Sequence, residues 1–306
     1  MRIIAIINYK GGVGKTTVTA NIASELAFRG KKVLIIDTDA QASLTFSFIR
    51  PEDWDLNLKD KKTIKNWFDA IAEGNEPPSL SSLIETPITV NKSIKNGGQV
   101  DIISSHLGLI NVDLELATLL GGANLVQTKK NYAKVHGKLR SSIQQLTDLA
   151  YDYILIDCPP NFNIVTKNAI IASELILIPA KPDYLSTLGI DYLQRSLNQL
   201  VKEYNEFTDN DHEKIYPKIL GVLFTMIQIN YGEPIGAQRQ FIAQTIRHGI
   251  HVFKGHFRDN KTIFADAPQN LQPVVTTKYN NITHSEIVKE IERIVSEFEN
   301  RIKDMQ

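Results

Sequence analysis

The N-terminal segment joins a short apolar run to a glycine-rich loop and then to a helical pattern. Residues 3–7 are all apolar, residues 9–17 have the sequence YKGGVGKTT, and residues 16–28 carry apolar side chains at helical spacing. This order predicts a buried parallel strand that turns into a helix. The glycines let successive N–H groups point inward, and the helix adds the positive end of its dipole. We therefore predict a phosphate-binding loop, whose contacting residues are Gly11, Gly12, Val13, Gly14, Lys15, Thr16 and Thr17.

Each polar residue of the loop has an expected partner. Lys15 reaches the β- and γ-phosphates, the Thr16 hydroxyl completes the coordination of Mg²⁺, and Thr17 contacts the α-phosphate. Tyr9 occupies the position of the first glycine in the common motif, and a second lysine, Lys10, enters the loop. This deviant pattern resembles the ParA/Soj/MinD family of ATPases. The resemblance implies that Lys10 touches the ATP of the partner subunit in a nucleotide-sandwich homodimer.

Composition limits the classes of protein to be considered. The chain has 306 residues, of which 42% are hydrophobic, which is enough for a sizeable core, and we favour one α/β domain over two. Its 34 basic residues balance its 34 acidic ones, so any nucleic-acid or membrane binding needs a local patch. The single cysteine, Cys158, excludes an intramolecular disulfide and a multi-cysteine metal cluster. No apolar run approaches the roughly 20 residues of a membrane span, and we expect a cytoplasmic protein.

Two further apolar runs end in carboxylates. Residues 33–36 precede Asp37 and Asp39, and residues 153–156 precede Asp157. Because ligands of open α/β sheets bind at the carboxyl ends of the strands, we expect these side chains at the phosphate site. In the resembled family Asp39 matches the residue that aligns the attacking water, Asp37 lies near the magnesium shell, and Asp157 holds Mg²⁺ through water. The chain departs from the family pattern at Ala40, where proline is usual, and at Asn161, where serine is usual.

Strand and helix patterns alternate along the rest of the chain. Strands are predicted at 100–105, 174–179, 220–226 and 252–257, and helices at 109–120, 188–204 and 236–248. This alternation predicts an α/β fold of the P-loop NTPase type, with a doubly wound, mainly parallel central sheet flanked by helices. Residues 50–98 are interpreted as a helical excursion within one domain spanning 1–306, with short helices at 63–71 and 80–84. A C-terminal helix is predicted at 284–304.

The resemblance also assigns the base and DNA contacts. It places the adenine pocket at Met226 and at a loop containing Arg258 and Asn260, although the family's proline is missing from this loop. Basic residues dominate 239–261, with Asp259 as the one acid, and ParA-like proteins bind DNA non-specifically through this region. The candidate DNA contacts are Arg239, Arg247 and Lys254. A second basic run at 127–140 is interpreted as a solvated helix face, with a nucleic-acid role left open.

Together with the phosphate loop, the resemblance implies a slow, partner-stimulated ATP hydrolase with Lys10, Lys15 and Asp39 as its catalytic residues. As an ATP-bound homodimer it would bind duplex DNA, associate with the nucleoid and position a plasmid, chromosome or protein cargo through a ParB-like adaptor. No helix-turn-helix pattern precedes the loop, so we expect no sequence-specific operator binding.

The alternative is a MinD-like membrane-cycling ATPase. The C-terminal helix is amphipathic, but its polar face is mainly acidic, which favours packing against the sheet over binding an anionic membrane. Reductase relatives with iron–sulfur clusters are excluded because the cysteine ligands are absent.

Overall fold

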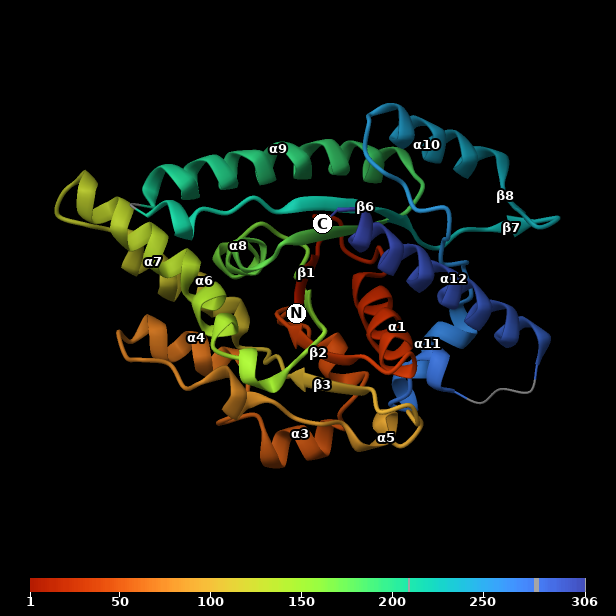
Figure 1. Cartoon of the computed structure of the whole chain (residues 1–306), viewed down its shortest axis with the longest axis horizontal. Helices are drawn as coiled ribbons and strands as arrows, with labels where there is room; N and C mark the ends of the chain where they lie inside the picture. The colour runs from red at the N-terminus through yellow and green to blue at the C-terminus, as the bar shows by residue number, and fades with distance from the viewer. Residues whose placement is uncertain (209, 278–280, 306) are drawn as a thin grey trace.

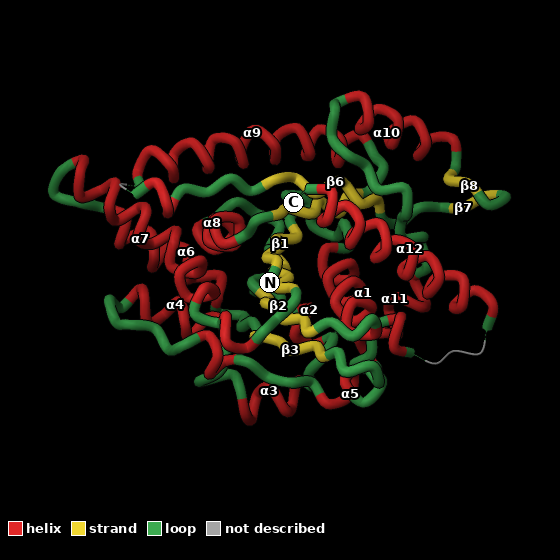
Figure 2. Tube along the Cα trace, viewed as in Figure 1, coloured by secondary structure: helices red, strands yellow, loops and turns green. Residues whose placement is uncertain are grey.

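A parallel sheet of six strands lies at the centre of the computed structural model, which describes residues 1–208, 210–277 and 281–305. The strand order is β3-β2-β4-β1-β5-β6, and each neighbouring pair is parallel (Figures 1 and 2). The doubly wound α/β fold predicted from the sequence is thereby confirmed. The strands are β1 (Arg2–Ile6), β2 (Lys32–Asp37), β3 (Gln99–Ile103), β4 (Tyr153–Asp157), β5 (Leu175–Ala180) and β6 (Lys218–Phe224).

Helices cover both faces of this sheet and bury two apolar layers (Figure 1). One layer contains apolar side chains of α1 (Lys15–Phe28), α11 (Lys261–Gln269) and α12 (Ile282–Asp304). The other layer is formed by α4 (Ile64–Ala72), α6 (Leu109–Ala117), α7 (Leu125–Gln144), α8 (Ile164–Ala172) and α9 (Tyr184–Phe207). Helix α10 (Gly236–Arg247) lies next to α9 at the margin of the molecule.

The C-terminal helix α12 packs against the body of the protein, as its acidic polar face led us to expect. Its apolar side chains are buried in the same layer as those of α1. Several of its acids bind groups from elsewhere in the chain: Glu299 accepts from Arg29 at 2.9 Å, and Glu290 accepts from Arg258 at 2.5 Å. The buried residues are Ile287, Ile291, Ile294, Val295, Phe298 and Ile302.

The excursion at 50–98 is helical, and its aromatic residues contribute to the core. Trp67 and Phe68 of α4 are fully buried, and Thr63 begins this helix through a capping box with Asn66. The helix predicted at 80–84 is instead a 3₁₀ helix, Leu80–Leu83. Prolines stand close on both sides of this segment and leave too few residues for a stable α-helix. The other helices here are α3 (Pro51–Asn57) and α5 (Ile88–Asn91).

The strand predicted at 252–257 does not form. Only isolated bridges connect this segment to its neighbours, Val252 with Val222 and Arg258 with Ile227. The N–H groups of Lys254 and Gly255 donate to the Glu297 carboxylate of α12 at 2.9 and 3.0 Å. The apolar alternation of the sequence predicted a strand. Phe253 and Phe257 do donate to β6, but a side chain on a distant helix takes the N–H groups of Lys254 and Gly255 between them.

His136 of α7 gives the fold a predicted sensitivity to acid. The ring is fully buried, its Nδ1 lies 2.9 Å from the Tyr132 carbonyl, and Nε2 has no hydrogen-bond partner in the described part of the chain. Burial, with a smaller contribution from Lys167, lowers the pKa of His136 to about 4. The unfolded chain takes up this proton near pH 6.5, whereas the folded chain does so only near pH 4. The free energy of unfolding should therefore decrease as the pH is lowered across this interval. At pH 5 it should be about 2 kcal/mol lower than at neutral pH.

Urea unfolding at about pH 7.5 and about pH 5 measures this effect. His136→Phe preserves an aromatic ring beside Tyr132 and removes the titrating group. The variant should lose about 2 kcal/mol less than the native chain between the two pH values. Equal losses in both proteins would show that His136 is not responsible.

Candidate functional site

The phosphate loop follows β1 and is held by backbone geometry and by contacts from β6. Gly12 and Gly14 adopt positive φ values of 66° and 79°, which residues with a Cβ rarely do. Thr225, directly after β6, donates its hydroxyl to the Val13 carbonyl at 2.8 Å. The Lys15 ammonium lies 3.3 Å from the carbonyls of Asn8 and Lys10. Burial lowers the pKa of Lys15, while the carboxylates of Asp157 and Asp39 oppose this effect.

Two buried carboxylates lie on neighbouring strands beside the loop. Asp37 and Asp157 are in register at the ends of β2 and β4. Asp157 accepts the Thr16 hydroxyl at 2.8 Å, whereas Asp37 accepts both the N–H and the hydroxyl of Thr45, at 2.8 and 2.7 Å. Burial raises the pKa of both carboxyls, and the charge of Asp157 raises that of Asp37 further. A bound cation would offset this unfavourable concentration of negative charge.

The oxygens present fit a magnesium site. The Thr16 hydroxyl and the Asp157 carboxylate are hard oxygen donors, and both face the phosphate loop. Among the described residues no group of three or more His, Cys, Asp or Glu could hold a metal. Mg²⁺ commonly uses one or two protein ligands together with substrate phosphates and water. The site therefore suits Mg²⁺ that arrives with a polyphosphate, with Asp37 acting by fixing Thr45 and the loop after β2.

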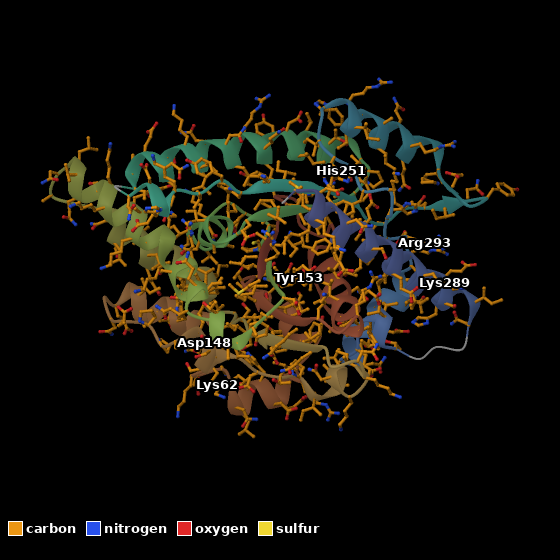
Figure 3. The ribbon with its side chains drawn as sticks, in the orientation of Figure 1. Lys62, Asp148, Tyr153, His251, Lys289 and Arg293 are labelled. Carbon is orange, nitrogen blue, oxygen red and sulfur yellow. The ribbon has the colours of Figure 1, made fainter. Side chains whose placement is uncertain are left out.

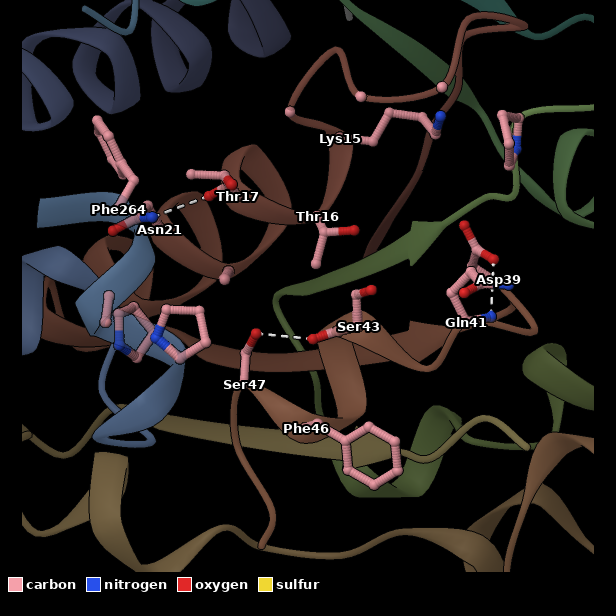
Figure 4. A pocket seen from close by; sticks show the side chains of 18 of the residues that line it. Lys15, Thr16, Thr17, Asn21, Asp39, Gln41, Ser43, Phe46, Ser47 and Phe264 are labelled. Carbon is pink, nitrogen blue, oxygen red and sulfur yellow. Dashed lines mark hydrogen bonds between the residues drawn. The ribbon is translucent and has the colours of Figure 1, made fainter. Parts of the chain in front are cut away.

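A cavity of about 730 Å³ opens over the loop and contains the sequence-predicted Asp39. The backbone N–H of Asp39 donates to Asp37 at 3.1 Å, and its side chain accepts from the backbone N–H of Gln41 at 3.0 Å. In Figure 4, Lys15 and Asp39 lie toward one end of this cavity, and Phe264 lies toward the other. The cavity is therefore long enough to separate a reacting phosphate end from an end suited to a base.

The predicted base contacts lie at this second end, but not all of them are free. Met226, with a positive φ of 54°, lines the cavity and also a smaller one of about 120 Å³ that contains Arg258 and Asn260. The Arg258 guanidinium pairs with Glu286 at 3.1 Å and with Glu290 at 2.5 Å. Asn260 begins α11 by accepting the Ile263 N–H at 2.9 Å. Arg258 and Asn260 are therefore engaged in structural contacts beside the smaller cavity. Of the three predicted base contacts, Met226 is the one that offers an apolar side chain to both cavities.

Sequence reasoning missed several residues that line the cavity beyond the phosphate loop. Asn21 lies four residues after Thr17 on the same face of α1, so helical spacing could have identified it. The remaining residues come from segments without any phosphate-site motif, and only folding brings them here. They are Ser43, Phe46, Ser47, Phe264, Ala267, Pro268 and Pro273.

Lys10 points away from its own phosphate loop. Its ammonium makes an ion pair with Asp183 at 2.7 Å and lies 3.3 Å from the Ser186 hydroxyl, at the start of α9. The side chain is one-third exposed, so this surface pair is weak and can exchange. Lys15 therefore lies inside the phosphate loop of its own chain, whereas the Lys10 side chain lies at the rim of the loop.

The C-terminal basic region is less uniformly positive than its sequence suggested. Glu297 faces His251 at 3.8 Å and Asp191 faces His248 at 3.5 Å, in addition to the Arg258 pairs. Asp259 is the only acid within residues 239–261, but acids from α9 and α12 fold against this segment and pair with some of its basic residues. The three candidate DNA contacts are exposed, and they make no ion pair within residues 1–208, 210–277 and 281–305. These residues are Arg239, Arg247 and Lys254.

Comparisons with known proteins identify relatives of this chain. A family model described as an AAA domain matches residues 1–209. The sporulation initiation inhibitor protein Soj of Bacillus subtilis is 28% identical over 282 residues, which cover 90% of each chain. The chromosome partitioning protein ParA of Caulobacter vibrioides is 24% identical over 273 residues, covering 89% of this chain and 82% of that protein.

Solved structures agree with the fold. The ATP complex of a Cyanothece McdA variant superposes with a TM-score of 0.69 at 18% identity, covering 99% of this chain and 96% of McdA. A cobyrinic acid a,c-diamide synthase from Mycobacterium smegmatis, with bound ATP analogue and magnesium, gives a TM-score of 0.62 at 22% identity and covers 88% of this chain and 91% of that enzyme. With the match to the family model and the Soj and ParA relatives, the chain therefore belongs to the AAA-domain family of ParA- and Soj-like P-loop ATPases.

Proposed function

We propose that this chain is a ParA-like ATPase that binds ATP and Mg²⁺, dimerises around the nucleotide and hydrolyses it slowly. The observation that carries this proposal is that the two lysines of the loop have different positions. Lys15 lies within the loop and contacts its carbonyls, whereas Lys10 stands at the rim and points outward. A cation at the rim can reach the phosphates of a facing subunit, so that each ATP contacts both chains. The solved relatives with bound ATP or an ATP analogue support the choice of nucleotide.

The chemistry requires little beyond positioning and charge neutralisation. A water attacks the γ-phosphorus, the bond to the ADP oxygen breaks, and inorganic phosphate leaves. Mg²⁺ bound with the nucleotide would neutralise part of the phosphate charge. Lys15 and the loop N–H groups hold the phosphates, and Asp39 accepts a hydrogen bond from the attacking water. Loss of the γ-phosphate removes contacts to both subunits, and the dimer then separates.

We further propose that the ATP-bound dimer binds duplex DNA non-specifically through Arg239, Arg247 and Lys254. All three side chains are exposed, and contacts to phosphates alone are sufficient for binding without sequence preference. Dimerisation doubles this patch and so links DNA affinity to ATP. In the cell such a protein would associate with the nucleoid and move a DNA or protein cargo through an adaptor that stimulates hydrolysis.

The MinD-like alternative has weaker support. A membrane-binding helix needs a free apolar face, and the apolar face of α12 is buried against the protein core. In the part of the chain that the structure describes, no helix has the length and apolar character to cross a bilayer. We therefore favour DNA over a lipid surface as the partner.

Molecular mass by light scattering tests the dimer proposal. The 34.4 kDa chain should double in mass with Mg²⁺ and ATP and remain a monomer with ADP. Lys10→Ala should bind ATP but stay monomeric, because the contact between subunits is lost while the loop is intact. Lys95→Ala, an exposed lysine outside the site, is the matched control. A Lys10→Ala protein that dimerises normally with ATP would overturn the assigned role of this lysine.

A further inference from the structure

Helix α7 concentrates positive charge in a chain whose overall charge is zero. Its 20 residues include five basic residues and no acidic one, whereas the whole chain has 34 of each. The helix lies at the end of the molecule opposite α10 and α11 (Figure 1). This surface is therefore separate from both the nucleotide cavity and the proposed duplex contacts. The five residues are Lys129, Lys130, Lys134, Lys138 and Arg140.

Four of these residues, all except Lys129, line a groove between α7 and the C-terminal end of α9. The groove has a volume of about 550 Å³, and α7 touches α9 at its base, where a Cβ on Gly137 would lie 2.5 Å from the Tyr204 hydroxyl. Lys130, Lys134 and Lys138 follow one another at four-residue intervals along its wall. Four residues of helix rise about 6 Å, so the groove presents a regular row of ammonium groups.

A second cavity of about 340 Å³ adjoins the groove and shares Arg140 and Gln144 with it. Arg140 lines both cavities and donates to the backbone carbonyls of Glu213 and Lys214, which fixes this loop against α7. Lys214 and Lys218 extend the positive lining, and Tyr216 beside them is 72% exposed. We refer to the groove and this adjoining cavity together as the channel; its lining also includes Arg2, which pairs with Glu174 at 2.7 Å.

Two acids, Glu213 and Glu174, line the cavities, and Glu174 pairs with Arg2 rather than with a basic residue of α7. Two basic residues of the channel itself have exposed acidic partners. Glu76 pairs with Lys138 at 2.8 Å and Asp211 pairs with Lys214 at 2.6 Å, but both carboxylate side chains are more than 80% exposed. Exposed pairs contribute little to stability and exchange readily. Lys130 and Lys134 make no ion pair within the described ranges. A ligand with repeated negative charge could therefore bind without displacing a strong internal pair.

Aromatic side chains along the channel distinguish a nucleic-acid strand from other polyanions. The Lys129 ammonium lies 5.1 Å from the centre of the Phe207 ring, which lines the groove, and Tyr216 is exposed further along. Sites for single strands combine a basic groove with aromatic side chains on which the bases stack. A groove of about 550 Å³ also suits one flexible strand better than a duplex, which is wider and rigid. We propose that this channel binds the phosphate backbone of a single nucleic-acid strand.

Fluorescence anisotropy with a labelled oligothymidylate of about 20 nucleotides tests the proposal. The native chain should bind it with a Kd between about 1 and 100 µM at physiological salt. The double variant Lys130→Glu/Lys134→Glu should bind at least about tenfold more weakly, and its salt dependence should fall by about 1.4 in log–log slope because two phosphate contacts are lost. Both residues lie on the exposed face of α7, so folding should be unaffected.

A matched control is available on α12. Lys289 and Arg293 have the same four-residue spacing, are exposed and lie far from the channel, on the opposite side of the view in Figure 3. Lys289→Glu/Arg293→Glu makes the same change in net charge and should bind the oligonucleotide within about twofold of the native chain. Equal weakening in both double variants, or no binding by the native chain below about 100 µM, would overturn the proposal.

Competition identifies the class of ligand. Polyglutamate carries repeated negative charge but no bases, so it should compete less well than unlabelled oligothymidylate of equal charge. If polyglutamate competes equally well, the channel takes an acidic protein segment and the proposal is wrong. If a duplex of about 20 base pairs competes better than the single strand and loses affinity in the α7 variant, the channel is part of the duplex surface, and the proposal is also wrong.

Discussion

Replacing Lys15 with alanine should reduce ATP hydrolysis by at least about 100-fold and abolish productive nucleotide binding. The ammonium is buried beside the loop carbonyls and near Asp157. Lys10, the other lysine of the loop, pairs with Asp183 and does not replace it at the β- and γ-phosphates. Its loss leaves the phosphate charge facing the carboxylates of Asp39 and Asp157. Binding of a fluorescent ATP analogue and steady-state phosphate release measure the two effects.

Lys95→Ala is the control for this prediction, because it removes an exposed lysine from a loop outside the site. The native chain and this control should hydrolyse ATP at the same rate. Thermal unfolding of Lys15→Ala should remain cooperative, which separates lost binding from lost folding. If the folded Lys15→Ala protein still turns over ATP, the assignment of the phosphate loop is wrong.

Asp39→Ala should separate nucleotide binding from hydrolysis. Asp39 lines the cavity at its phosphate end, while Asp37 and Thr45 shape the loop around it through their own hydrogen bonds. Removing the carboxylate therefore leaves the ATP contacts in place and takes away the group that aligns water. We expect hydrolysis to fall by about 10²- to 10⁴-fold and the ATP-bound dimer to persist.

Chromatography with light scattering after incubation with ATP measures this persistence. The native chain should return to monomer as ATP is consumed, whereas Asp39→Ala should remain a dimer. Asp53→Ala, an exposed acid on α3, is the control and should behave as the native chain does. A monomeric Asp39→Ala protein that still binds ATP would contradict the proposed link between hydrolysis and dissociation.

The strands and the phosphate loop were predictable because their signals are local. Uninterrupted apolar runs precede Gly11, Asp37 and Asp157, and burial on both faces of a parallel sheet requires such runs. The same reasoning failed at 252–257, where alternation predicted a strand but Glu297 of a distant helix binds the backbone. Long-range side-chain contacts of this kind leave no periodic trace in the sequence.

The candidate site likewise contains residues that a local motif identifies and residues that only tertiary packing brings together. Gly14, Lys15 and Thr16 belong to one motif, and their arrangement follows from the chain order. The partner of Lys10 is Asp183, which lies 173 positions later and is recognisable in sequence only as the residue that begins a helix. Phe264 reaches the base end of the cavity from α11, a helix whose sequence carries no nucleotide motif. Contacts made by tertiary packing therefore required the structure.

Binding of non-specific duplex DNA with ATP, with ADP and without nucleotide tests the central claim most directly, with Lys10→Ala as the comparison. The account predicts that the native chain binds only with ATP, that affinity falls steeply across a salt series, and that Lys10→Ala does not bind. Binding that is equal in all nucleotide states, or absent from all of them, would contradict an ATP-controlled switch between DNA-bound dimer and free monomer.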